Sequence, residues 1–370
     1  MLRPDENTHK FIISSTSRFV GEYENENLLI THAWPSTENI GQLYAGQTEN
    51  PYSRNYFIIV YKSEPYEKAP GVAIPNYDWL SEFICIYLGI LFGKRFDNHG
   101  AVETNGFFFL ANTNEVGTPI RFHDIGVNNH RPRCDLQFPL NLSEFKLLEP
   151  LISGKVDERV ISIANAAGRF YLRSVRLFET DPEVAFLDLV TCGEILSNYY
   201  QYTDEELYDD GIRHILNTIE QNNGSEVANT IKSRLYQVRR KYVLTITKLL
   251  NAYFFQNTES KQGFASLKRE DIIDRIKASY DLRSLYVHNG IKIGNWLDPH
   301  SFLNEVQVGI PVVESKDLQK LLCLTPTWTG MERIMRYCLL RFLHLNGVSI
   351  DKRLDGDKDV QDKRILRRKG

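Results

Sequence analysis

Hydrophobic positions follow two different patterns along the chain. Before about residue 150 they form short apolar or aromatic runs at Phe11–Ile13, Phe57–Tyr61 and Phe107–Leu110, bounded by Asn, Gly, Ser and Pro. Such runs predict β-strands, and Asn105-Gly106 predicts a tight turn before the third of them. One helix is expected among the strands, over about Tyr77–Phe92.

After residue 150 the apolar positions recur with helical spacing. A proline suits the first turn of a helix, so Asp181-Pro182 predicts a capped helix start. Helices are expected over Val156–Phe178, Pro182–Tyr200, Ser225–Phe254, Arg269–His288 and Trp328–Leu345. The third of these is long and could be kinked. The predicted fold class is α+β, with a mixed, strand-rich domain over 1–150, an all-α up-and-down bundle over 151–350 and a charged, solvated tail over 351–370.

Charge and cysteine usage narrow the class of protein. Residues 1–150 carry 12 Lys and Arg against 18 Asp and Glu, and residues 151–370 carry 32 against 29, which gives a formal charge of −3. This balance excludes a strongly basic nucleic-acid coat but leaves room for a local basic groove. The five cysteines are scattered without a CxxC pair, which argues against a zinc knuckle or a disulfide framework.

No targeting or membrane segment is expected. The N-terminus lacks the apolar core of a signal peptide. The longest apolar run, Ile84–Phe92, is nine residues long, and a membrane-spanning helix needs about 20. A reducing cytoplasm fits best, without a membrane partner.

Common cofactor motifs are missing. The chain has no GxxxxGK[ST], no GxGxxG after a strand and no GxSxG. His123-Asp124, with His130 nearby, is similar to the dyad of metal phosphohydrolases, but no ordered set of further ligands follows, so neither a metal nor another cofactor is expected. Phe107–Phe109 could stack bases, although packing in the core is the commoner role of such residues.

The segment Arg269–Gly290 is the most informative. Ile273, Ile276, Tyr280 and Val287 form a predicted core-facing stripe, and Arg283 lies at its edge. A guanidinium cannot lose its charge, so Arg283 is expected either to meet a carboxylate inside the protein or to border a cleft.

His288 follows in the last helical turn before the stop signal Asn289-Gly290. It lies about 140° round the helix from Arg283, so one helix does not point both side chains the same way. They would converge if two copies met across a two-fold axis, or if the helix end frayed. Histidine can take the proton of a ribose 2′-OH near neutral pH, and a guanidinium can stabilise charge on phosphoryl oxygens.

This R-x4-H spacing resembles the signature of the HEPN superfamily, and RSLYVHNG resembles its Apea-like branch. DPEVAFLDLVTCGEIL (Asp181–Leu196) looks like the first core helix of that branch, which carries a glutamate near the position of Glu194. MERIMRYCLLRFL (Met331–Leu343) resembles its closing helix. The similarity covers about Val156–Leu345.

The resemblance implies an all-helical domain that dimerises with the motif helices in a shared cleft. Members with the intact motif are typically metal-independent endoribonucleases of antiviral defence, abortive infection or toxin systems, and others are non-catalytic. Arg283 and His288 would be the catalytic pair, with Glu194, Ser284 and Asn289 in support. The family usually has a polar residue after the arginine, and Ser284 is polar but short.

The sequence leaves several interpretations of these residues and domains open. Glu194 is either the partner of Arg283 or another basic residue, or simply exposed, and Asn289 either holds a phosphate or caps the helix. Arg234, Arg239, Arg240 and Lys241, with Lys232 and Lys248, form either a track for RNA or a solvated face. The bundle could instead be a dimerisation scaffold or an RNA-binding module without activity. Residues 1–150 are expected to sense a phage or regulatory trigger, by analogy alone.

Overall fold

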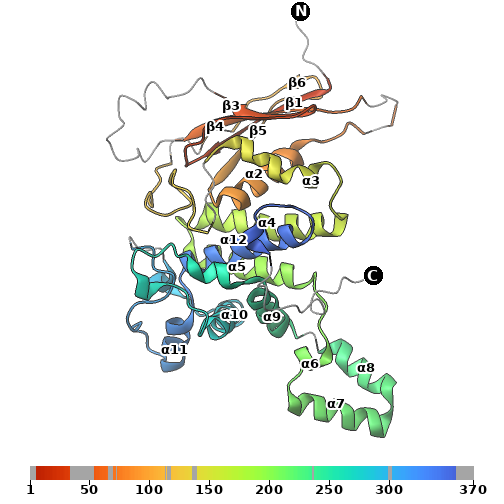
Figure 1. The fold of residues 1–370 in the computed structure, drawn as a ribbon, viewed down its shortest axis with the longest axis vertical. Coiled ribbons are helices and arrows are strands. Elements are labelled where there is room, and N and C mark those ends of the chain that lie inside the picture. The colour runs from red at the N-terminus through yellow and green to blue at the C-terminus, as the bar shows by residue number, and fades with distance from the viewer. Residues whose placement is uncertain are drawn as a thin grey trace, which may run out of the picture.

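The computed structural model (Figure 1) describes residues 6–33, 54–65, 70–71, 73–112, 114, 118–135, 140–235, 237–298 and 302–355. Its strands form one antiparallel sheet in the order β2-β3-β4-β1-β5-β6. The strands are β1 (Thr8–Ser15), β2 (Tyr23–Glu24), β3 (Leu28–His32), β4 (Asn55–Lys62), β5 (Phe96–Thr104) and β6 (Phe107–Phe108).

The helices lie on one side of this sheet in successive layers (Figure 1). Helix α2 packs against the sheet and against α4, and α12 packs against α2, α4, α5 and α9. The helices are α2 (Asp78–Phe92), α3 (Glu149–Ile152), α4 (Glu158–Leu177), α5 (Pro182–Ser197), α6 (Asp204–Leu207), α7 (Asp210–Asn223), α8 (Ser225–Arg234), α9 (Val238–Leu249), α10 (Ile272–Asn289), α11 (Lys316–Leu324) and α12 (Trp328–Leu345). The fold class is therefore α+β, as predicted.

One hydrophobic core runs through these layers. It joins Phe11 of the sheet, Ile84 of α2, Leu172 of α4 and Met335 of α12, all fully buried. Every side chain from Trp328 to Leu343 is buried, which makes α12 the centre of the helical part. All described strands lie before residue 150, but so does α2, which packs on α4 and α12, and the predicted division into two domains at residue 150 stays a prediction.

Local sequence signals correctly predicted where several helices and one hairpin turn begin or end. Helix α12 spans the expected residues, and the Asp181 side chain accepts a hydrogen bond from Val184 N at the start of α5. Asn105 and Gly106 have φ of 51° and 78° and close the β5–β6 hairpin, where Thr104 pairs with Phe107. A two-residue turn with both φ positive suits the twist of a hairpin.

Other expectations were wrong. The long helix expected over Ser225–Phe254 is not merely kinked but broken between α8 and α9, where Gln237 adopts a left-handed φ of 46°. Phe254 lies in a 3-10 helix, Ala252–Gln256. The tail is not solvated throughout, because Leu354 is buried and its carbonyl accepts a hydrogen bond from Arg341 Nε at 3.1 Å. Residues 356–370 lie outside the described residues. None of the described helices has the length and apolar character needed to cross a membrane.

Candidate functional site

Helix α10 carries the R-x4-H motif and ends where the sequence predicted. Gly290 adopts a left-handed φ of 65°, and its N–H donates to Tyr286 O at 3.1 Å. Glycine takes this conformation without the steric cost that a Cβ would bring. Asn289 is therefore the last helical residue, and His288 lies in the final turn.

The buried face of α10 differs from the predicted stripe. Ile276 is buried as expected, together with Ile272, Ser279 and Leu282, but Ile273 and Val287 are half exposed, at 50% and 51%. Packing against α5 and α9 on one side and against α11 on the other determines which face of α10 is buried. As a result Arg283 points toward the protein rather than along a solvated edge.

Arg283 faces a carboxylate on α5. Its Nη2 lies 3.4 Å from Glu194 Oε2, and the two side chains are 23% and 15% exposed. Burial raises the pKa of Glu194, while the Arg283 charge and a hydrogen bond with Tyr280 act in the opposite direction. Of the two arrangements expected for Arg283, the structure shows the one with an internal carboxylate, and Glu194 supplies it.

His288 and Asn289 are exposed at the end of α10. Because Arg283 turns inward toward α5, one chain does not bring the arginine and the histidine together. The loop after the helix is fixed to α5, since Glu183 Oε1 accepts hydrogen bonds from Ile293 N at 2.6 Å and Gly294 N at 2.7 Å. This anchoring argues for an ordered helix end and against fraying.

Ser284 lies about 100° round the motif helix from Arg283, where it borders a groove of about 790 Å³ between α10 and α11. Leu285, Ile291 and Leu318 supply apolar lining, and Asp281 and Asp317 supply carboxylates. Ser284 therefore contacts a different surface from the one that Arg283 faces.

The basic residues of the expected RNA track are largely engaged with acidic or carbonyl oxygens. Arg239 forms two bonds with Asp281 on α10, at 2.6 and 2.7 Å. Arg240 Nε donates to Glu206 O at 2.6 Å. Lys241 lies on α9 beside them and is half buried, and the side chain of Arg234 lies outside the described residues. These contacts are those of a solvated, ion-paired face.

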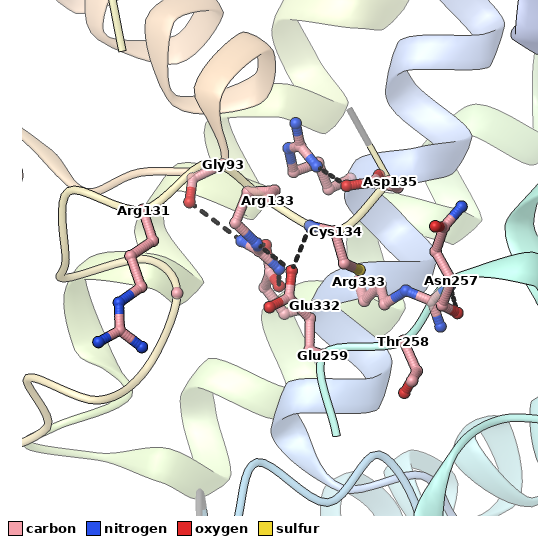
Figure 2. Close-up of polar contacts among 12 residues, drawn as sticks. Gly93, Arg131, Arg133, Cys134, Asp135, Asn257, Thr258, Glu259, Glu332 and Arg333 are labelled. Atoms are coloured by element: carbon pink, nitrogen blue, oxygen red, sulfur yellow. Dashed lines mark hydrogen bonds and ion pairs between the residues drawn. The ribbon is translucent and has the colours of Figure 1, made fainter. Parts of the chain in front are cut away.

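A second polar cluster, which the sequence analysis missed, is buried between the first 150 residues and α12 (Figure 2). Arg133 donates from Nη1 and Nη2 to Glu332 at 3.0 and 2.5 Å, and from Nε to Glu259 at 2.6 Å. Arg336 pairs with Asp135 at 2.5 Å. The charged residues inside the apolar run of α12 were the one signal that could have indicated such a cluster.

Three side chains of this cluster, Cys134, Asp135 and Glu259, bring possible metal ligands within 4.8 Å of one another. Arginines already hold both carboxylates, and burial raises the pKa of the Cys134 thiol well above its usual value of 9.0. A protonated thiol beside guanidinium groups is a poor metal ligand. The arrangement fits a structural ion-pair network better than a metal centre.

Comparisons of the chain with protein-family models, with curated proteins and with solved structures found no match. The candidate site therefore depends on its own geometry and on the motif of α10.

Proposed function

We propose that this protein is a metal-independent endoribonuclease of the HEPN type, acting in the cytoplasm in antiviral defence, abortive infection or a toxin system. The observation that carries the proposal is the end of α10, where Arg283 is held by Glu194 and His288 is presented to solvent before a fixed helix stop. These are the residue types that metal-free cleavage of RNA requires, in the order and spacing of the HEPN motif.

In the proposed reaction His288 takes the proton from the ribose 2′-OH. The 2′ oxygen then attacks the adjacent phosphorus, the bond to the 5′ oxygen of the next nucleotide breaks, and that oxygen takes up a proton from solvent while His288 returns its own proton to solvent. The products are a 2′,3′-cyclic phosphate and a 5′-hydroxyl. Arg283 stabilises charge on the phosphoryl oxygens, and Glu194 is its positioning residue.

The proposal includes a homodimer. Because Arg283 and His288 diverge on one helix, a complete site requires Arg283 of one copy and His288 of the other, which an isologous contact between two α10 helices would provide. Ile273 and Val287 are exposed apolar side chains on this helix and suit such a contact.

The ion pairs of Arg283 and Arg239 also favour a second candidate, a scaffold or RNA-binding module without activity. A guanidinium held by a carboxylate is as common in structural pairs as in active sites. Cleavage of RNA separates the two candidates.

His288→Ala should abolish cleavage of RNA, with a rate loss of about 10²–10⁴ for the missing base. Arg283→Lys should also be strongly impaired, because an ammonium cannot replace the planar fork. EDTA should leave the wild-type rate unchanged, and a 2′-O-methyl group at the cut site should block cleavage. Gel assays with labelled RNA, and circular dichroism to check folding, measure these effects.

Ile215→Lys, on the exposed face of α7, serves as the matched surface control and should cleave like wild type. Cleavage that survives both motif substitutions, or that requires added Mg²⁺, would refute the assignment. RNA binding without any cleavage would favour the second candidate.

A further inference from the structure

Strand β6 and the two residues that follow it expose four consecutive apolar side chains at the edge of the sheet. Phe107, Phe108, Phe109 and Leu110 are 60%, 71%, 52% and 99% exposed. The expectation that these phenylalanines pack in the core was therefore wrong. Isolated exposed apolar residues are ordinary, but a contiguous group of large ones marks an interaction surface.

The backbone of this edge also has free bonding capacity. Thr104 pairs with Phe107 in the hairpin, and Phe109 N donates to Val102 O at 3.0 Å. In an antiparallel pair alternate residues face the partner strand, so the N–H and C=O groups of Phe108 and Leu110 point away from β5. No backbone partner for these groups is found in the part of the chain that the structure describes.

Natural sheet edges normally avoid pairing with other strands by means of charged residues or prolines. This edge has neither, since the segment from Thr104 to Asn114 contains no Lys, Arg, Asp, Glu or Pro. An uncharged edge can meet an identical edge without like-charge repulsion. Self-complementarity of this kind is what a two-fold symmetric contact requires.

We propose that Phe108–Leu110, the end of β6 and the two residues after it, pair antiparallel with the same segment of a second copy of this chain, which joins the two sheets into one. With the two-fold axis at Phe109, Phe108 exchanges backbone hydrogen bonds with Leu110 of the second copy, and the reverse. Phe109 then lies opposite its own counterpart. The phenylalanines pack across the contact on both faces of the joined sheet.

The exposed area is sufficient for such a contact. At roughly 200 Å² for each fully exposed side chain, the exposed fractions of these four residues amount to about 550 Å² in each copy. Full burial of these side chains in two copies would cover at most about 1,100 Å², and specific interfaces need at least about 1,000 Å².

This interface is independent of the catalytic proposal. Strand β6 and helix α10 lie toward opposite ends of the molecule (Figure 1), so a contact through one leaves the other open. If both contacts form, alternation of the two would link molecules into an open chain, because two separate two-fold interfaces do not close in general.

Phe108→Lys in the full-length protein tests the inference. The substitution places two ammonium groups in the contact and should weaken self-association at least about tenfold. Light scattering and sedimentation velocity over a micromolar concentration range should show a lower mass than for wild type. Ile215→Lys adds the same charge to an exposed apolar position on α7 and should leave the mass unchanged.

Disulfide formation tests the register. Opposed residues in a non-hydrogen-bonded pair have Cα atoms about 4.5 Å apart, within the range for a disulfide, so Phe109→Cys should cross-link two copies under mild oxidation. Phe107→Cys should not, because its counterpart in the second copy lies four residues away along the strand. Equal masses for wild type and Phe108→Lys, or a failure of Phe109→Cys to cross-link, would overturn the proposal, whether or not the protein cleaves RNA.

Discussion

At the scale of single residues, Glu259 shows how burial and pairing compete. Its Oε1 accepts hydrogen bonds from Arg133 Nε at 2.6 Å and from Cys134 N at 3.2 Å. Burial alone would raise the pKa of this carboxyl, but the Arg133 charge and the hydrogen bonds outweigh burial and lower it to about 2 from 4.5. The folded state therefore favours the ionised, carboxylate form of Glu259.

A pH dependence follows from this lowered pKa. The contribution of Glu259 to the free energy of unfolding is present above pH 4.5 and is lost as the pH falls toward about 2. Between about pH 5 and about pH 3 the loss should be about 2 kcal/mol. Urea unfolding at a series of pH values measures it. Glu259→Gln removes the titrating group and should give a flatter profile, and equal profiles for both proteins would contradict the assignment.

At the scale of elements, the first turn of α12 packs directly on the backbone that precedes α11. A Cβ built at Gly330 would lie 2.1 Å from the carbonyl oxygen of Glu305. Thr327 N donates to that same carbonyl at 3.1 Å, so neither segment can move without breaking a hydrogen bond. The absence of a side chain at residue 330 is what allows the close approach.

Gly330→Ala should consequently destabilise the protein by roughly 3 kcal/mol, because backbone rather than a flexible side chain must shift. Chemical denaturation measures the change. Gly263→Ala is the matched control, since nothing lies within 4 Å of its added Cβ, and it should alter stability by less than about 0.5 kcal/mol. Similar losses for the two variants would show that the close approach is not limiting.

At the scale of the whole molecule, buried ion pairs connect the first 150 residues to the last helix. The Glu332 carboxylate on α12 accepts hydrogen bonds from Arg133 and from the Tyr171 hydroxyl, the latter at 2.7 Å. Arg336 donates to Ile90 O and Leu91 O at the end of α2. Since these groups are nearly inaccessible to water, neither part can open without exposing unpaired charges of the other.

We therefore expect thermal unfolding in a single transition seen equally by sheet and helix signals. Glu332→Ala leaves Arg133 without its bidentate partner and should lower stability by about 3–5 kcal/mol while the transition stays single. Asp274→Ala, which removes a surface pair with Lys277, should change it by less than about 1 kcal/mol. Differential scanning calorimetry measures both, and two separated transitions in the wild type would instead support independent domains divided near residue 150.

Sequence signals located elements wherever the information was local. Asp181-Pro182, Asn105-Gly106 and Asn289-Gly290 each marked a boundary through their own backbone preferences. Strand β5 was missed because Asp97, His99 and Glu103 interrupt its apolar pattern, and all three are buried through partners elsewhere in the chain. Helices α7 and α11 were also missed, and each has one buried side chain.

The candidate site, like the fold, could be predicted only where the signal lies within one segment of the sequence. The motif fixed Arg283 and His288 on one helix, and the structure adds the contact between Arg283 and Glu194, 89 residues away. The rotation of α10 was beyond the sequence, because it depends on packing against α5, α9 and α11. The Arg133–Glu332 pair, separated by 199 residues, has no local signature at all.

The position of α12 has a consequence for the timing of biosynthesis. This helix follows the sheet and the other described long helices in the sequence, and its side chains from Trp328 to Leu343 fill the centre of the molecule. Before residues 328–343 are synthesised, Arg133 lacks Glu332, Asp135 lacks Arg336, and the faces of α4 and α5 that pack on α12 are uncovered. The sheet and the early helices therefore gain their full native stability only after residues 328–343 have been synthesised, so these parts acquire it together rather than progressively.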